Sequence, residues 1–248
     1  MSGLSAIICS RNAGNLEACL DALHRCECGI LPIVVDDGLP EGAASGRTMI
    51  RVQGKRPFVF ARNVNLGIRA AREDDVFLLN DDALVMTQGG VSWMRAAARA
   101  SERIGVLSAV TNVTGYPEQS IGYRPMRGRV AARVWPTATV AFLGVLIPRR
   151  VIDSVGLLDE RFVTYGGEDV DYCRRVRRAG LTVSVYDGCF VDHGSLRSTF
   201  RPHGGGGDTA EGLRILAEKW GDAEKSVETN LDAADMNVRA TMSKEREE

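Results

Sequence analysis

Three short apolar runs in the first third of the chain constrain its fold more than any other feature. Residues 4–9, 31–35 and 75–79 are continuously apolar-rich rather than alternating, which is typical of strands that are buried on both faces. Between these runs, residues 15–25 and 58–72 carry apolar side chains at helical spacing. Strands that alternate with helices predict an α/β fold with a mostly parallel central sheet flanked by helices.

Each of these runs ends in a cluster of polar residues. Residues 10–12 follow the first run, Asp36 and Asp37 follow the second, and Asp81 and Asp82 follow the third. Because ligands of such sheets bind beyond the carboxyl ends of the strands, we expect the clusters to share one edge. Adjacent carboxylates are costly unless a cation is near, and Mg²⁺ and Mn²⁺ prefer oxygen ligands. Turns and helix starts also favour aspartate without a metal, so the pairs alone leave both interpretations open.

The rest of the chain continues the pattern of alternating helices and strands. We predict helices at residues 91–103, 168–179 and 209–220, and strands at residues 105–110, 133–147 and 181–186. The predicted organisation is one domain over residues 1–221, followed by a charged tail at 222–248 that has few large apolar residues.

Composition argues against several classes of protein. Lys and Arg (31) nearly balance Asp and Glu (32), so bulk charge does not indicate a nucleic-acid or membrane partner. The six cysteines show neither a disulfide framework nor zinc spacing, which predicts a reducing, cytoplasmic location. The longest apolar-rich run, residues 138–147, is about half of what a spanning helix needs. We therefore expect no transmembrane segment, and any membrane contact is expected to be peripheral.

Four motifs in order give the sequence a family resemblance. They are VVDDG at 34–38, ARNVNLGIRAA at 61–71, LLNDDA at 78–83 and GGEDVDYCRRVRRAG at 166–180. Together they resemble the family 2 glycosyltransferases of GT-A fold, especially the rhamnosyltransferase-like branch, over most of the chain. The resemblance implies that residues 1–110 bind a nucleotide sugar, and that residues 111–221 bind the acceptor and carry the catalytic group.

The resemblance places the donor nucleotide at the ends of the first strands. It implies that Cys9, Ser10 and Arg11 lie near the base or ribose. It also implies that Asp37, with Asp36 as the weaker candidate, binds the pyrimidine edge or the ribose. A carboxylate can accept a hydrogen bond from a pyrimidine imide N–H. The other residues implied for this donor site are Arg62 as a diphosphate ligand, its neighbour Asn63, and Gly144, where the backbone would approach the donor.

Asn80, Asp81 and Asp82 match the Asp-x-Asp-like motif of that family, except that asparagine stands at its first position here. The resemblance therefore implies that Asp82 binds Mn²⁺ or Mg²⁺ directly. Asn80 and Asp81 would lie against the donor, with Asp81 touching the ribose or a metal-bound water. In related enzymes a histidine after the strand predicted here at 181–186 completes the metal shell, which assigns that role to His193.

Glu168 and Asp169 resemble the family's acidic pair at a helix start. Asp169 would be the general base that removes the proton of the acceptor hydroxyl, with Glu168 beside it, and the helix N-terminus would stabilise its anionic form. The implied activity is an inverting, metal-dependent transfer of a sugar from a UDP- or dTDP-linked donor to an acceptor hydroxyl. A glycan is the expected acceptor.

Two other functions stay open at this point. A sugar-nucleotide nucleotidyltransferase also uses aspartates and a metal on a related sheet, although residues 10–14 match its glycine-rich phosphate loop only faintly. A non-catalytic nucleotide-sugar-binding protein would bind the donor without turnover. The arginines of residues 124–133 suit either a phosphate-bearing acceptor, such as a nucleic acid or a lipid-linked sugar, or a solvated surface. Arg197, Arg201 and the glycines 204–207 are candidates for a lid over the diphosphate.

Overall fold

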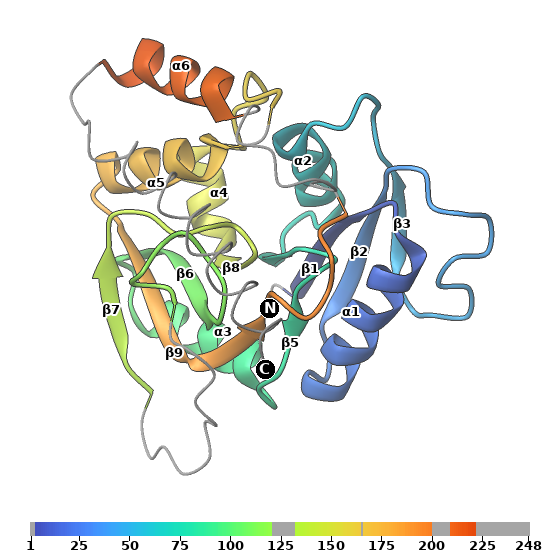
Figure 1. The fold of residues 1–248 in the computed structure, drawn as a ribbon. Coiled ribbons are helices and arrows are strands. Elements are labelled where there is room, and N and C mark those ends of the chain that lie inside the picture. Colours follow the sequence, from blue (N-terminus) through green and yellow to red (C-terminus); the bar gives the residue numbers. More distant parts are fainter. Residues whose placement is uncertain (1–2, 121–131, 165, 200–208, 222–248) are drawn as a thin grey trace, which may run out of the picture.

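The structure, a computed structural model, describes residues 3–120, 132–164, 166–199 and 209–221. Its strands are β1 (Leu4–Ser10), β2 (Leu31–Asp36), β3 (Ile50–Gln53), β4 (Asp75–Leu79), β5 (Leu84–Val85), β6 (Ile104–Thr111), β7 (Val134–Thr137), β8 (Gly144–Ile147) and β9 (Thr182–Asp192). Its helices are α1 (Ala13–Cys26), α2 (Phe60–Ala70), α3 (Gly90–Ala100), α4 (Arg149–Val155), α5 (Glu168–Arg178) and α6 (Thr209–Trp220). Figure 1 shows the strands gathered into a central sheet with helices around it.

The strands form a nine-stranded sheet in the order β3-β2-β1-β4-β8-β6-β9-β5, with β7 paired to β9. β3, β2, β1 and β4 are parallel neighbours. β8 runs antiparallel to both β4 and β6, so β6 has the direction of β4, and β9 is parallel to β6. Six strands therefore point one way, while β5, β7 and β8 point the other way. The predicted α/β fold with a mostly parallel central sheet is confirmed.

Helices bury both faces of the sheet. α1 and α3 pack on one face, through residues such as Leu20 and Met94. α2, α4 and α5 pack on the other face, through residues such as Ile68, Val151 and Tyr172. Every residue of β1, β4 and β6 is buried, which explains why these strands read as continuous apolar runs.

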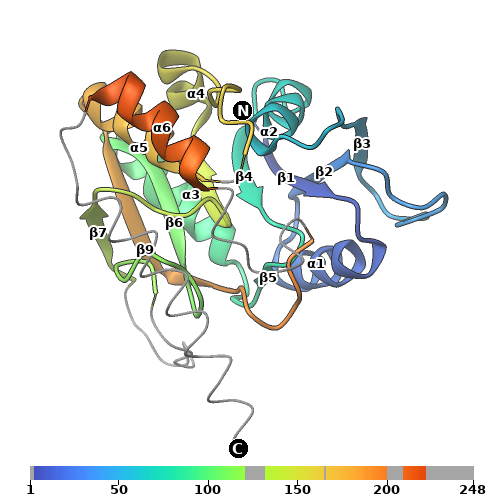
Figure 2. The ribbon, with the colours of Figure 1, turned by 45° about the horizontal axis from the view of Figure 1, so that its top comes forward.

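Helix α6 lies outside α5 rather than on the sheet, as Figures 1 and 2 show. Its residues Ile215 and Leu216 share a small apolar cluster with Val170 of α5 and with Phe162. α6 therefore covers the segment that leads into α5. No helix in the described ranges has the length and apolar character needed to span a bilayer.

The region predicted as one strand at residues 133–147 is two strands, so that prediction was wrong. β7 is an edge strand whose residues are alternately exposed and partly buried, and it pairs with β9. β8 is fully buried between β4 and β6. An apolar run does not reveal that the chain leaves the sheet and re-enters it elsewhere. β9 also continues past its predicted end at residue 186 to Asp192, across an irregularity opposite β6, and thereby delivers His193.

Candidate active site

The polar clusters at the strand ends meet at one edge of the sheet. β1 lies between β2 and β4, so Ser10 neighbours the ends of both strands. The backbone amide of Asp37 donates to the carbonyl of Ser10 (2.9 Å), and the Ser10 hydroxyl donates to Asp81 Oδ2 (2.6 Å). Segments that are far apart in sequence therefore form a single polar cluster, as expected from the ends of parallel strands.

Asp81 is buried and already accepts hydrogen bonds from two hydroxyl groups. The residue is 2% exposed, and its Oδ2 is bonded by Ser10 Oγ and by Thr199 Oγ1 (2.7 Å). Burial raises the pKa of Asp81 to about 6, although these two hydrogen bonds oppose the shift. The surroundings of Asp81 are therefore suited to holding hydroxyl groups against a carboxylate.

Asp82 and His193 come together from the ends of different strands. Asp82 follows β4, His193 follows β9, and His193 Nε2 lies 3.5 Å from Asp82 Oδ1. The other ring nitrogen, Nδ1, lies 3.0 Å from the carbonyl oxygen of Val113. Because a carbonyl only accepts, Nδ1 carries a proton and Nε2 is directed at Asp82. Burial lowers the pKa of His193, but the carboxylate of Asp82 outweighs burial and raises it.

A carboxylate oxygen is a ligand that suits Mn²⁺ and Mg²⁺, and a histidine nitrogen is a common metal ligand. Within the described part of the chain, no group of three or more His, Cys, Asp or Glu side chains is placed to hold a metal ion. Two protein ligands are enough where substrate phosphates supply other ligands, as is usual for Mg²⁺. Asp82 and His193 therefore fit a cation that binds together with a diphosphate better than they fit a permanent structural metal.

The adjacent residues Asp36 and Asp37 have different surroundings. Asp36 Oδ1 accepts from the amides of Gly38 and Leu39 (2.7 Å each), and Oδ2 accepts from Arg51 Nε (3.0 Å). Its carboxylate is thus occupied by the turn after β2. Asp37 is 2% exposed, and its Oδ1 is buried without a hydrogen-bond partner among the described residues. Because buried polar atoms normally find partners, the free oxygen favours Asp37 over Asp36 as the acceptor for a ligand N–H.

Positive charge surrounds Asp37. Burial raises the pKa of Asp37, whereas Arg56, Arg11 and Arg62 oppose the shift. Nitrogens of Arg11 and Arg56 each lie 4.0 Å from a carboxylate oxygen of Asp37, and the side chains of both arginines are substantially exposed. A buried carboxylate with arginines around it suits a ligand that carries both an N–H donor and phosphate groups.

Arg62 and Asn63 hold the loop after β3. The Arg62 guanidinium donates to the carbonyls of Lys55 (3.3 Å) and Pro57. Asn63 Oδ1 accepts from the amide of Lys55 (2.9 Å). The sequence did not predict this structural role, and Arg62 would have to leave these carbonyls to bind a diphosphate.

Cys9 and Gly144 lie within the sheet. Cys9 is buried on β1, and burial raises the pKa of its thiol, so its contribution is packing. Gly144 pairs with Leu79 at the end of β4. A Cβ atom on Gly144 would lie 3.0 Å from Cγ2 of Val191, so packing alone accounts for a glycine here. The neighbouring carbonyl of Leu143 accepts from the amide of Asn80 (3.2 Å), which places β8 against the predicted metal-binding turn.

Glu168 and Asp169 begin helix α5, as predicted. Glu168 is buried, and its Oε2 accepts from the amide of Gly166 (3.0 Å). Asp169 Oδ1 accepts from the amide of Val170 (2.7 Å), and Oδ2 lies 3.5 Å from the hydroxyl of Tyr116. The first turn of the helix and a buried phenol thus orient the carboxylate of Asp169.

The segment 112–119 contacts both the predicted metal ligand His193 and the predicted base Asp169, and these two contacts were not predicted from the sequence. Its Val113 carbonyl contacts His193, and its Tyr116 hydroxyl contacts Asp169. No local pattern marks these residues, because their roles depend on how β6 pairs with distant strands.

Asn112 and Gln119 anchor this segment at its two ends. Asn112 Oδ1 accepts from the amide of His193 (2.8 Å), and its Nδ2 donates to Asp192 (2.8 Å). Gln119 is fully buried and bonds both the amide and the carbonyl of Ala141 (2.9 and 3.1 Å). The Asn112 contacts hold His193 next to the end of β6, and the Gln119 contacts hold the other end of the segment to Ala141.

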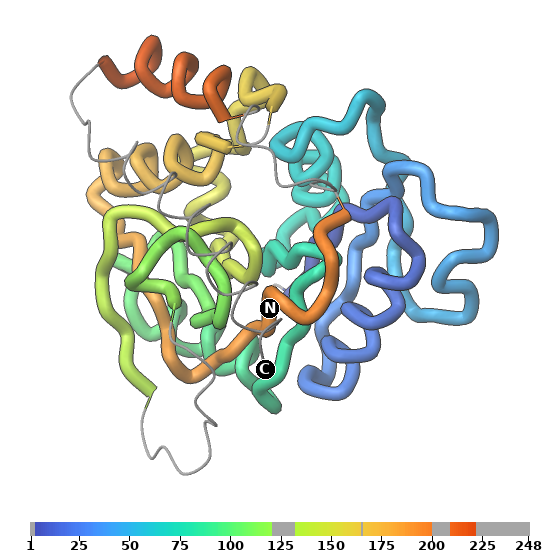
Figure 3. The backbone as a smooth tube through the Cα atoms, in the orientation of Figure 1, coloured from blue at the N-terminus to red at the C-terminus, as the bar shows by residue number. Residues whose placement is uncertain are grey.

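The chain after β9 crosses to the ends of β1 and α1, as Figure 3 shows. Asn15 of α1 donates to Thr199 Oγ1 (3.0 Å) and to the carbonyl of Arg197 (2.8 Å). The N-cap of α1 is Asn12, whose side-chain oxygen accepts from the amide of Asn15 (3.2 Å). The other proposed lid residues, Arg201 and 204–207, lie outside the described residues, as does most of the arginine-rich stretch 124–133.

Comparisons with known proteins identify the fold. No protein-family model matches the sequence. The chain is 28% identical over 178 residues to the uncharacterized protein y4gI of Sinorhizobium fredii (strain NBRC 101917 / NGR234). The match covers 60% of this chain and 19% of that protein. The crystal structure of GalNAc-T7 with UDP, GalNAc and Mn²⁺ matches with a TM-score of 0.69 and 13% identity, over 90% of this chain and 49% of that one. The chain thus shares this fold, which confirms the expected GT-A architecture, but it spans only part of either protein.

Proposed function

We propose that this chain is a metal-dependent glycosyltransferase that moves a sugar from a nucleotide diphosphate sugar to an acceptor hydroxyl. The observation that carries the proposal is the convergence of Asp82 and His193, 3.5 Å apart at the strand-end edge that also holds Asp37 and Asp81. The fold is shared with a structure that contains UDP and Mn²⁺. In this proposal residues 1–110 hold the donor, and residues 111–221 bind the acceptor and supply the base.

The donor in this proposal is UDP- or dTDP-linked. Uracil and thymine nucleotides carry one imide N–H. Oδ1 of Asp37, which is buried without a hydrogen bond and lies 4.0 Å from Arg56 Nε, is the acceptor for it in this proposal. Asp81 accepts a ribose hydroxyl in the place that the hydroxyl of Thr199 now takes. Arg11 follows β1, which lies between β2 and β4. Its guanidinium lies 4.0 Å from Asp37 and donates to the carbonyl of Thr199 (3.3 Å), and in this proposal it turns from that carbonyl to the phosphates.

Asp82 and His193 hold Mn²⁺ or Mg²⁺ in this proposal, and the bound ion supplies positive charge that stabilises the leaving diphosphate. Asp169 accepts the proton of the acceptor hydroxyl, whose oxygen forms a bond to the anomeric carbon. The bond from that carbon to the diphosphate oxygen breaks on the opposite face, so the configuration inverts. The transition state has oxocarbenium character, and Tyr116 keeps the carboxylate of Asp169 oriented.

We further assign the chain to the rhamnosyltransferase-like branch of family 2, on the strength of the four motifs in order. The expected acceptor is a glycan. The six cysteines are free thiols, which supports a reducing, cytoplasmic location.

Thermal stabilisation by nucleotides tests this proposal. UDP or dTDP at about 100 times its Kd is expected to raise the melting temperature by about 5–10 °C with Mn²⁺, and to have no such effect in EDTA. A panel of nucleotide sugars with Mn²⁺ should then show release of the nucleoside diphosphate. Asp82→Asn should abolish both effects, whereas Asp153→Asn, a control at an exposed position on α4, should change neither.

The outcomes separate the competing functions. Binding without release of the nucleotide would indicate a nucleotide-sugar-binding protein. Formation of pyrophosphate from a nucleoside triphosphate and a sugar phosphate would indicate a nucleotidyltransferase. No shift with any nucleotide and any divalent ion would overturn the assignment of Asp82 and His193.

A further inference from the structure

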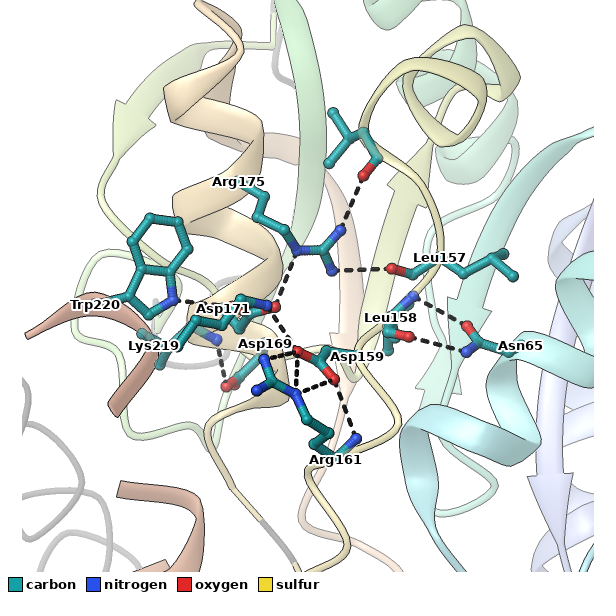
Figure 4. Close-up of polar contacts among 12 residues, drawn as sticks. Asn65, Leu157, Leu158, Asp159, Arg161, Asp169, Asp171, Arg175, Lys219 and Trp220 are labelled. Atoms are coloured by element: carbon teal, nitrogen blue, oxygen red, sulfur yellow. Dashed lines mark hydrogen bonds and ion pairs between the residues drawn. The ribbon is translucent and has the colours of Figure 1, made fainter. Parts of the chain in front are cut away.

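Helix α6 is tied to both ends of the segment that presents Asp169. Nζ of Lys219 lies 2.7 Å from Asp159 Oδ2 and 2.8 Å from Asp171 Oδ1. Asp159 stands before Asp169 in the sequence and Asp171 stands two residues after it. One ammonium group therefore bridges the two ends of the segment made of residues 159–164 and 166–171, which we call the base segment. Figure 4 shows these side chains converging beside Asp169.

Asp171 fixes the far end of the base segment. It is 0% exposed, and its Oδ2 accepts from Arg175 Nε (2.9 Å). Its Oδ1 accepts from Trp220 Nε1 (2.9 Å) in addition to the contact with Lys219. Because a buried carboxylate depends on its charged partners, the first turn of α5 is held by the end of α6 as well as by its own helix.

Asp159 fixes the near end. Hydrogen bonds from Arg161 and from Lys219 hold the pKa of Asp159 well below its usual range. The preceding residue, Leu158, is anchored from α2, because Asn65 donates to its carbonyl and accepts from its amide (3.0 Å each). The base segment thus begins between two supports, α2 on one side and α6 on the other (Figure 4).

The middle of the base segment also touches α6. Gly166 and Gly167 form the turn before α5 with φ angles of 106° and 98°, which only glycine adopts easily. A Cβ atom on Gly212 of α6 would lie 2.0 Å from the carbonyl oxygen of Gly166, so the two backbones are in direct contact. Phe162 packs against Ile215 nearby. The position of α6 therefore sets the position of the turn.

We propose that Lys219 is a positioning residue, which holds the base segment and thereby places the carboxylate of Asp169 for proton transfer. The proposal rests on the proposed function, since it takes Asp169 as the base. A general base must be held within a fraction of an ångström of its productive position. Two adjacent glycines leave the turn before Asp169 free to move, and the contacts of α6 remove that freedom.

Lys219→Met tests the proposal, because it keeps the length of the side chain and removes the bridge. Arg214→Met is the matched control on the same helix, since Arg214 pairs with Glu211 and Glu218 of α6 itself. Amide hydrogen exchange of residues 166–171, measured without metal or substrate, should quicken at least tenfold in Lys219→Met and less than twofold in the control. The transfer kcat should fall at least tenfold in Lys219→Met, while its Kd for UDP with Mn²⁺ stays within twofold. Lys219→Arg should recover most of both losses.

Asp159→Asn is the second variant, to be used if Lys219→Met does not fold. It removes one end of the bridge and leaves Asp171 paired with Arg175, and it should quicken exchange in the same residues. Unchanged exchange and kcat in the folded variants, or equal losses in Arg214→Met, would overturn the role of Lys219. If the wild-type protein transfers no sugar, the proposed function fails, whereas the exchange measurement still decides whether Lys219 holds the base segment.

Discussion

Replacing Asp37 by asparagine tests how the site recognises its ligand. The side chain of Asp37 is 2% exposed, and Oδ1 has no hydrogen-bond partner in the described ranges. An imide N–H would give that buried oxygen a hydrogen bond. A hydrogen bond to a charged group contributes about 1.5–3 kcal/mol, and about 1.4 kcal/mol is tenfold in affinity. Asparagine keeps one neutral oxygen that can accept, so the loss is the difference between a charged and a neutral hydrogen bond, about 1–1.5 kcal/mol. We therefore expect Asp37→Asn to raise the Kd for UDP, with Mn²⁺ present, by about 5- to 10-fold.

Replacing Asp37 and replacing its neighbour Asp36 should have opposite effects on the free energy of unfolding. Asp37→Asn removes a buried charge whose pKa burial raises, so the free energy of unfolding of the ligand-free protein should stay constant or increase at neutral pH. Asp36→Asn is the matched control. Its carboxylate accepts from two amides and from Arg51, so it should lower the free energy of unfolding by about 1–3 kcal/mol with a much smaller effect on Kd.

Calorimetric titration with UDP and with N3-methyl-UDP tests the proposed hydrogen bond between the imide N–H and Asp37 by changing the ligand instead of the protein. The wild-type protein should bind UDP far more tightly than the methylated nucleotide, which lacks the imide N–H. The ratio of the Kd for N3-methyl-UDP to the Kd for UDP should be smaller in Asp37→Asn than in the wild type. A folded Asp37→Asn protein that binds UDP within twofold of wild type, or a wild-type protein that does not distinguish the two nucleotides, would refute the base contact.

Three further predictions follow from single residues. Asp169→Asn should keep the Kd for UDP within twofold and lower the transfer kcat by at least about 100-fold in a product-formation assay, whereas equal loss of both would make its role structural. Asn112→Ala removes the acceptor for the His193 amide and should weaken Mn²⁺ binding about tenfold in an electron paramagnetic resonance titration with UDP, whereas unchanged affinity would contradict this. Burial raises the pKa of Asp75, but hydrogen bonds from a backbone amide and Arg95 outweigh it and lower the pKa, so the stabilisation is present above about pH 4 and is lost as pH falls. Chemical denaturation at pH 7 and pH 3 measures this effect. Asp75→Asn should lower the free energy of unfolding by about 3 kcal/mol at pH 7, and its free energy of unfolding should fall less between pH 7 and pH 3 than that of the wild type. An equal fall in both proteins would contradict the role of Asp75.

The N-terminal half of the sheet was predictable because each of its main strands has a clear pattern in the local sequence. β1, β2 and β4 are continuous apolar runs that end in polar residues, and the helices between them have clear periodicity. The second half offered weaker signals. β5 has two residues, and its place beside β9 is set by tertiary pairing. β8 is inserted against the direction of its neighbours, which periodicity cannot reveal.

The site shows the same limit at the level of single residues. Asp36 and Asp37 are adjacent in the sequence, and only the hydrogen bonds of the turn show that both oxygens of Asp36 accept hydrogen bonds whereas Oδ1 of Asp37 accepts none. Asn112, Thr199 and Lys219 carry no local signal, because each contacts a segment that is distant in sequence. The resemblance identified candidate groups, whereas the residues that orient them emerged from the packing of the chain.

The central claim is that Asp82 and His193 hold one divalent cation against a diphosphate. The most direct test is a crystal structure of the protein with UDP and MnCl₂, with the ion located by its anomalous scattering. We expect one manganese peak at about 2.1 Å from a carboxylate oxygen of Asp82 and from Nε2 of His193, with diphosphate oxygens completing its shell. Manganese bound away from both side chains, or UDP bound in the site without an ion, would contradict the account.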